Sequence, residues 1–184
     1  MQQLRVFSNF SLLAIILMAI GGCFAEKLKE NWQKSGQSIF DYCEGLYYTS
    51  ETPQKTLCQI LKLEANDNTP SGDSYINCNF RLLNYVNDEG LIDGDKIIQD
   101  FHAAQITDKD SEVNQIIQDC EQELPSKKAI DYYTCFLINN NVKSSFSKVF
   151  KARGVRPQNS DSNYDSETAV LQYDLKANDC SSDV

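Results

Sequence analysis

The sequence predicts an all-α fold, a compact bundle of about seven helices stapled by disulfides. Two observations carry this prediction. Apolar residues recur at intervals of three and four along most of the chain, which is the spacing of one helix face. Six cysteines lie between residues 43 and 180, and an even number is typical of a disulfide-bonded extracellular domain. With 184 residues, the chain is long enough for one or at most two small domains.

Residues 1–25 are predicted to be a secretory signal peptide. Arg5 supplies the positively charged N-terminal region of a signal peptide. The apolar stretch 12–20 is too short to span a bilayer, and small residues precede a cleavage site after Ala25. An alternative interpretation is a lipoprotein box at residues 20–23, whose cysteine would be lipidated. Cleavage after Ala25 predicts a secreted, extracellular protein with no membrane association afterwards.

Four helices are predicted in the first half of the chain. The first follows the apolar stripe of residues 32–48. The second spans residues 53–63 and begins at a proline, which is well tolerated at a first helical position. A polar run with Pro and Gly predicts a loop over residues 66–73. The third helix is expected over residues 75–86, and the fourth around residues 97–101.

Three further helices are predicted in the second half. Their apolar stripes cover residues 110–120, 125–138 and 142–150, and Pro125 opens the second of them. Gly154 and Pro157 stop the last one, because a proline cannot continue a helix. Together these elements predict one helical domain over residues 26–157.

Residues 158–184 are predicted to be an acidic, polar linker and tail. The stretch 158–168 is almost entirely polar, so it buries too little apolar surface to offset the cost of ordering. Some apolar pattern returns over residues 169–175, ahead of Cys180. A disordered tail has little need of a cysteine, so we expect Cys180 to tie the tail back to the body.

Composition argues against several classes of function. A net charge of −9 and a pI near 4.6 disfavour nucleic-acid binding, which needs clustered Lys and Arg. With His102 as the single histidine, a His-rich metal site cannot form and a His-dependent catalytic centre would rest on one residue. No cysteine pair has the spacing of a zinc site. We therefore expect no metal, no cofactor and no enzymatic activity.

Short motifs around the cysteines resemble those of a known superfamily. They comprise Tyr42-Cys43, Leu57-Cys58 and the run YINCNF over residues 75–80, all within the predicted helices. This pattern resembles the insect odorant-binding proteins. The later runs DYYTCFL over residues 131–137 and SSFSKVF over 144–150 resemble the short salivary D-seven proteins of blood-feeding mosquitoes. The resemblance implies helices arranged around a central ligand pocket.

Six cysteines permit fifteen pairings, among which the sequence alone does not choose. The superfamily pattern implies Cys43–Cys78, because it joins the first and third helices. The resemblance also implies Cys120–Cys135, and an antiparallel helix pair around Pro125 would bring these two together. Cys58 and Cys180 would then form the third bridge.

The resemblance also implies a ligand-binding set. Matched from the cysteines, the basic residue of amine-binding members falls at Lys62, their histidine at Tyr75 and their tyrosine at Tyr133. Their two amine-gripping carboxylates fall at Lys151 and Gly154, so both acids are missing. Basic and phenolic donors without a matching acid favour an anionic or acceptor-rich ligand over an amine. The alternative interpretation is that the tyrosines pack the core and the lysines are solvated.

Three functions follow from these observations. The leading one is a secreted salivary protein that sequesters host mediators, namely biogenic amines, eicosanoids or nucleotides, to counter haemostasis and inflammation during blood feeding. The second is an odorant or pheromone carrier of similar fold. The third is a protein-binding inhibitor of contact-phase coagulation, for which the acidic stretch 161–167 would meet a basic exosite on a host coagulation protein.

Overall fold

A computed structural model describes residues 25–48, 54–63, 69–87, 89–124, 126, 128–157, 159–160 and 165–179. Within these ranges the chain is all-α, with two isolated bridges at Ser38–Pro157 and Val86–Ile92. The predicted signal peptide, apart from Ala25, and Cys180 lie outside the described residues. Among the helices described, none has both the length and the apolar character required to cross a membrane.

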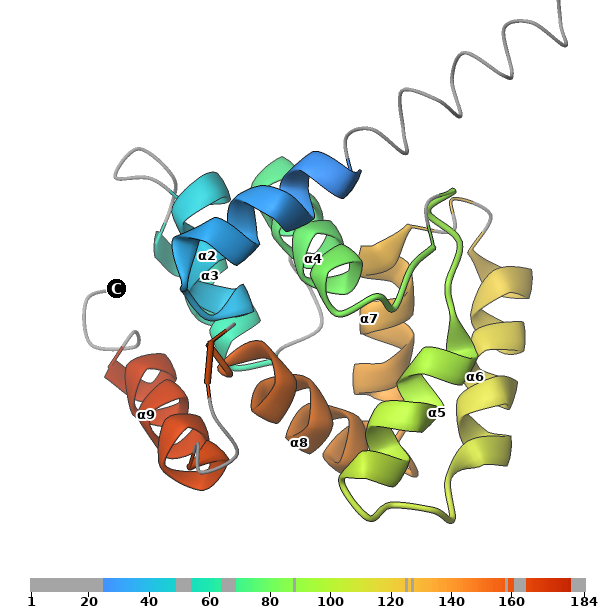
Figure 1. Cartoon of the computed structure of the whole chain (residues 1–184). Helices are drawn as coiled ribbons and strands as arrows, with labels where there is room; N and C mark the ends of the chain where they lie inside the picture. The colour runs from blue at the N-terminus through green and yellow to red at the C-terminus, as the bar shows by residue number, and fades with distance from the viewer. Residues whose placement is uncertain are drawn as a thin grey trace, which may run out of the picture.

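Residues 25–35 form an unlabelled N-terminal helix, and eight labelled helices follow. These are α2 (Ile39–Tyr47), α3 (Gln54–Leu61), α4 (Pro70–Leu82), α5 (Gly94–Ala103), α6 (Asp110–Glu123), α7 (Ala129–Ile138), α8 (Lys143–Gly154) and α9 (Ser166–Asp179). Figure 1 shows α6 and α9 at opposite edges of the molecule, with α4, α7 and α8 between them.

The single helix predicted over residues 32–48 is wrong, because the structure breaks it before α2. Gly36 has a φ of 69°, a left-handed conformation that ends the N-terminal helix at residue 35. Trp32 Nε1 donates to the Gln37 carbonyl across the break, at 3.1 Å. The Ser38 hydroxyl then accepts from the Asp41 N–H at 3.1 Å and starts α2. After the break, α2 buries Ile39, Phe40 and Cys43 in the bundle.

Three other helix boundaries differ from the prediction. The loop expected over residues 66–73 ends at Thr69, because its side chain accepts from the Gly72 N–H at 3.2 Å and starts α4 at Pro70. At the other end, Asn84 adopts a φ of 60° and ends α4 before Val86. The helix expected from Pro125 begins only at Ala129. Prolines and polar residues thus marked the right regions, displaced by a few residues.

The tail forms a helix that the sequence analysis did not predict. α9 packs against α8 and α3, and it adds Tyr173 and Ala177 to the buried core. Its opposite face leaves Leu171 and Leu175 exposed. Asp165 starts the helix by accepting from the N–H groups of Glu167 and Thr168, both at 3.1 Å. The part of the tail that is described is therefore docked on the bundle.

Disulfides and aromatic side chains hold the centre together. Cys43–Cys78 joins α2 to α4 with a Cα–Cα distance of 5.9 Å, and Cys120–Cys135 joins α6 to α7 at 6.1 Å. These are the two pairs that the resemblance implied. Cys58 is also disulfide-bonded. The core includes fully buried aromatic side chains from α4, α7 and α8, namely Tyr75, Phe80, Tyr132, Tyr133, Phe136, Phe146 and Phe150.

Candidate ligand-binding site

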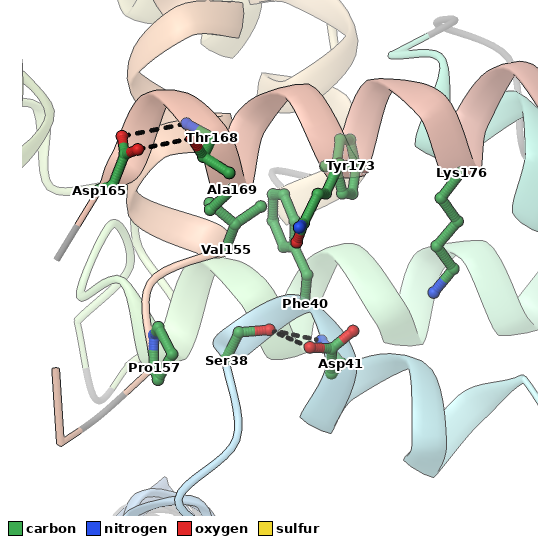
Figure 2. Close-up of a pocket in the computed structure, with 11 residues that line it drawn as sticks. Ser38, Phe40, Asp41, Val155, Pro157, Asp165, Thr168, Ala169, Tyr173 and Lys176 are labelled. Atoms are coloured by element: carbon green, nitrogen blue, oxygen red, sulfur yellow. Dashed lines mark hydrogen bonds between the residues drawn. The ribbon is translucent and has the colours of Figure 1, made fainter.

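A hollow of about 580 Å³ lies between α2, the segment after α8, and α9. Figure 2 shows it from the side, with the start of α2 below and α9 above. We call it the α2–α9 hollow. Its volume lies within the range of natural small-molecule sites. Its lining residues are Ser38, Phe40, Asp41, Val155, Pro157, Asp165, Thr168, Ala169, Gln172, Tyr173 and Lys176.

Two aromatic rings form the inner wall of the α2–α9 hollow. Phe40 of α2 and Tyr173 of α9 point toward each other, with ring centroids 5.0 Å apart (Figure 2). Phe40 also packs on Phe150 of α8 at 5.1 Å, so the wall continues into the aromatic core. The two rings present apolar, π-rich surface to anything that enters the hollow.

Gly154, at the end of α8, leaves the space that the Phe40 ring occupies, because glycine has no side chain. A Cβ placed on Gly154 would overlap the Phe40 ring more closely than any real contact allows. A side chain of any kind at position 154 would therefore displace the ring. The carboxylate that amine-binding relatives were inferred to carry at this position has no room here.

Two carboxylates stand at the rim of the hollow, one on each side (Figure 2). The Ser38 hydroxyl donates to Asp41 Oδ2 at 2.7 Å, and the Thr168 hydroxyl donates to Asp165 Oδ2 at 2.5 Å. Hydrogen bonds from the Thr168 side chain and backbone hold the pKa of Asp165 below its usual value. In the described part of the chain, neither Asp41 nor Asp165 pairs with a Lys or Arg. The rim therefore carries two oriented negative charges.

Two ion pairs hold α9 over the hollow. Lys151 Nζ of α8 lies 2.5 Å from Asp174 Oδ1, and Lys176 Nζ lies 2.6 Å from Glu44 Oε2 of α2. The Lys151 ammonium also lies 6.0 Å from the centre of the Tyr173 ring, a cation–π distance. Because Lys176 is engaged by Glu44, its charge at the rim is already matched.

The four residues implied by the resemblance do not form one site in the structure. Lys62 is exposed just after α3, whereas Tyr75 and Tyr133 are each 1% exposed in the core. Lys151 lies under α9, and none of the four lines the α2–α9 hollow. The sequence analysis expected Lys151 to have no acidic partner. The structure corrects this expectation, because Lys151 forms an ion pair with Asp174. Asp174 was overlooked because its helix was not predicted.

The structure does bring three of the tyrosines close together. Burial raises the pKa of Tyr75, Tyr133 and Tyr173, and each of the first two adds to the raised pKa of Tyr173. All three therefore stay neutral phenols at physiological pH. Tyr133 donates weakly to the Ile60 carbonyl at 3.4 Å. The tyrosine cluster behind the hollow is neutral and offers hydrogen bonds without charge.

Among the described residues, two buried polar groups in this cluster make no hydrogen bond of normal geometry, although they lie close enough for Asn79 to oppose the raised pKa of Tyr75. They are the Tyr75 hydroxyl and the side-chain amide of Asn79, one turn apart on α4. Asn79 is 0% exposed, and a buried polar group without a partner costs about 1–3 kcal/mol. The sequence analysis did not identify Asn79 as a candidate site residue, and used it only as part of the YINCNF motif. Its spacing of four from Tyr75 and three from Leu82 puts it on the apolar face of α4, but polar side chains are usually exposed, so the sequence offered no reason to single it out.

Sequence reasoning also missed Asp41, Asp165 and Tyr173. A signal existed for the first two, since Ser38 and Asp41 are three apart, as are Asp165 and Thr168, at helix starts. Tyr173 and Ala177 are four apart, which is one helix face. No signal in the sequence indicates that α2 and α9 lie next to each other.

Comparison with known proteins places this geometry in context. The PBP/GOBP family matches residues 25–139. The long form salivary protein D7L1 of Aedes albopictus is 32% identical over 132 residues, which cover 69% of this chain and 39% of that protein. The chain thus spans about two fifths of the length of that relative.

Two solved structures share the fold. An AeD7–leukotriene E4 complex is 27% identical, with a TM-score of 0.60, over 73% of this chain and 45% of that chain. The Anopheles gambiae D7R4–norepinephrine complex is 26% identical, with a TM-score of 0.56, over 78% of this chain and 100% of that chain. Both relatives hold a small molecule.

Proposed function

Because this chain belongs to the PBP/GOBP family, we propose that it is a secreted salivary protein that captures a small host mediator and so counters haemostasis and inflammation during blood feeding. Capture by mass action requires no turnover. Relatives complexed with leukotriene E4 and norepinephrine support small-molecule binding as the family's activity. The salivary relatives support secretion.

The observation that carries the proposal is the α2–α9 hollow. It combines an apolar aromatic wall, Phe40 and Tyr173, with two oriented carboxylates, Asp41 and Asp165. This combination suits a small organic ammonium ion with an aromatic body. The rings stack on the body and attract the cation, and the carboxylates accept hydrogen bonds from the ammonium group.

An amine in this hollow would use other contacts than those inferred for the amine-binding relatives. Position 154 has no room for a carboxylate, and Lys151 is engaged by Asp174. The proposal therefore departs from the anionic ligand that the sequence favoured for this part of the molecule. That preference rested on an unmatched Lys151, and the ion pair removes its basis.

Calorimetric titration of the secreted chain tests the proposal, with serotonin, norepinephrine, leukotriene E4, ADP and decanoate as the panel. We expect serotonin to bind at one site per chain. The double variant Asp41→Asn with Asp165→Asn should weaken serotonin at least about tenfold, because two charge-assisted contacts become neutral. Asp108→Asn, an exposed acid far from the hollow, is the matched control and should change nothing.

Two outcomes would count against the proposal. Saturation by no member of the panel would contradict small-molecule capture itself. Serotonin binding that survives the double variant unchanged would place the ligand elsewhere in the fold. A clotting-time assay on the same preparation tests the alternative in which the partner is a coagulation protein. Asp161–Tyr164, part of the acidic stretch invoked for that role, lie outside the described residues.

A further inference from the structure

A second hollow of about 530 Å³ lies on the other side of α9, between α5, α8 and α9. We call it the α5–α9 hollow. We propose that it binds an amphiphilic organic anion, a carboxylate carried on an alkyl chain, independently of the α2–α9 hollow. The proposal adds a binding site to the function proposed above and does not depend on it.

The wall of the α5–α9 hollow is aliphatic. Its apolar residues are small and come from all three helices: Ala103, Ala104, Val149, Ala152 and Val170. Val149 is 1% exposed and belongs to the core, so the wall is continuous with the interior. No aromatic ring lines it among the described residues. A nucleobase would find nothing to stack on, whereas an alkyl chain would bury its methylene groups.

The rim of the α5–α9 hollow is basic. Lys148, Arg153 and Arg156 lie along the end of α8 and just after it, facing two acids, Asp100 and Glu167. The three cations leave the lining with a net positive charge. This sign runs against the net charge of −9 of the whole chain, so the basic residues are locally concentrated rather than typical.

The buried acid of this hollow is already used inside the protein. Asp100 is 5% exposed and accepts from Arg153 Nε at 3.0 Å and from Lys96 Nζ at 3.1 Å. One carboxylate between two cations leaves one positive charge in excess. The pairing also fixes the Arg153 side chain at the wall. A carboxylate ligand would meet a positioned guanidinium group rather than a mobile one.

The outer cations supply the rest of the attraction. Lys148 is exposed and makes no ion pair within the described ranges. Arg156 adds a second cation at the rim, where its Nε also donates to the Ser160 hydroxyl at 2.8 Å. Glu167 is the remaining acid of the lining, and it is exposed on α9. A carboxylate head between Lys148 and Arg153 leaves its alkyl chain against Val149, Ala152 and Val170.

The two hollows share no lining residue, because they use different faces of α9. Residues 168, 169, 172, 173 and 176 line the first, and residues 167 and 170 line the second. With 3.6 residues per turn, these sets point to different sides of the helix. Occupation of one hollow therefore needs no displacement from the other.

Titration of the secreted chain with decanoate tests the second site. We expect one decanoate per chain, and at least about tenfold weaker binding in the double variant Lys148→Gln with Arg156→Gln, since two cations are lost from the rim. Lys143→Gln, an exposed lysine at the other end of α8, is the matched control and should bind as the wild type does. Arg153 is not substituted, because its removal would take one partner from the buried carboxylate of Asp100 and would destabilise the fold.

Three comparison ligands and one comparison variant decide the assignment. Decanol has the same chain without the charge, and its binding as tightly as decanoate would overturn the role of the basic rim. ADP or inorganic phosphate that binds more tightly than decanoate, and is lost in the same double variant, would overturn the alkyl carboxylate. Loss of decanoate in the Asp41→Asn, Asp165→Asn variant would show that only one hollow binds ligands. Circular dichroism checks that every variant keeps its helices.

Discussion

The two faces of α9 border hollows of similar size and opposite chemistry. Toward α2, aromatic rings form the wall and two carboxylates, Asp41 and Asp165, form the rim. Toward α5, alanines and valines form the wall and lysine and arginine dominate the rim. The difference shows that the tail, which the sequence analysis did not predict to be helical, contributes to both hollows. A ligand in either proposed site would therefore contact residues outside the matched family region, residues 25–139.

The same helix also differs between its inner and outer sides. Tyr173 and Ala177 are 7% and 4% exposed, whereas Leu171 and Leu175 are 60% and 55% exposed. Burial of one large aromatic side chain contributes about 2–3 kcal/mol, more than a partly exposed ion pair at about 1 kcal/mol or less. Tyr173 thus holds α9 in place more strongly than Lys151–Asp174 or Lys176–Glu44 does. The same Tyr173 side chain therefore forms part of the aromatic wall of the α2–α9 hollow and holds α9 on the bundle.

The largest expected effect comes from removing that anchor. Tyr173→Ala should lower the free energy of unfolding by about 3 kcal/mol or more, because it leaves a cavity beside Phe40. Leu171→Ala, on the exposed side of α9, should change it by less than about 0.5 kcal/mol. Urea unfolding followed by circular dichroism measures both. Equal losses in the two variants would mean that α9 is not docked by the Tyr173 side.

A pair of glycines gives the next largest effect. Gly154→Ala should destabilise the protein by about 1–3 kcal/mol, since the added methyl group overlaps the Phe40 ring. Gly45→Ala in α2 is the control, because a Cβ there meets nothing within 4 Å, and it should stabilise by up to about 1 kcal/mol. Thermal unfolding distinguishes the two signs. A neutral Gly154→Ala variant would show that the wall of the first hollow gives way easily.

These two predictions show how far the sequence could reach. It indicated the helix-rich fold, because apolar periodicity is a local property that α4 to α8 express directly. It could not indicate Phe40 against Gly154 or Phe40 against Tyr173, because these contacts join segments far apart in the chain. It did not predict α9, because the polar residues around Asp165 were expected to bury too little apolar surface to become ordered. In the structure, the same polarity starts the helix.

The candidate site illustrates the same limit. Matching from the cysteines identified Tyr75 and Tyr133, which do lie together in the core, but it gave no information on Asp41, Asp165 or Asp174. A helix that lies after the matched region cannot be placed by a motif inside it. The charge of Lys151 was read without its partner for this reason.

A double-mutant cycle between Lys151 and Asp174 should show a smaller effect. We expect a coupling free energy of about 0.5–1 kcal/mol, because the pair is partly exposed, at 20% and 42%. The cycle between Lys34 and Glu30, at 69% and 61% exposed, is the control and should give less. A coupling near zero for the first pair would remove the reason for treating Lys151 as matched, and the anionic ligand would return as the hypothesis for that site.

The smallest effect is a pH dependence at the acidic rim. Hydrogen bonds lower the pKa of Asp165 below 3.8 in the folded protein. The carboxylate therefore keeps its negative charge, and its attraction for a bound cation, until the pH falls through this lower pKa. Serotonin affinity should therefore stay constant between pH 7 and about pH 5, and fall only below pH 3.8, the usual pKa of this carboxyl group. The Asp41→Asn, Asp165→Asn double variant serves as the contrast, since neither position can then lose a charge in this range. A fall in serotonin affinity already near pH 6 would contradict a carboxylate rim.

The central claim is that the two faces of α9 bind different ligands at the same time. Calorimetric titration with serotonin, run once on the free protein and once on protein saturated with decanoate, tests this most directly. The account predicts the same dissociation constant and one serotonin per chain in both runs. Loss of serotonin binding in the decanoate-saturated protein, or a shift of its dissociation constant in proportion to decanoate concentration, would show a single shared site and would contradict the account.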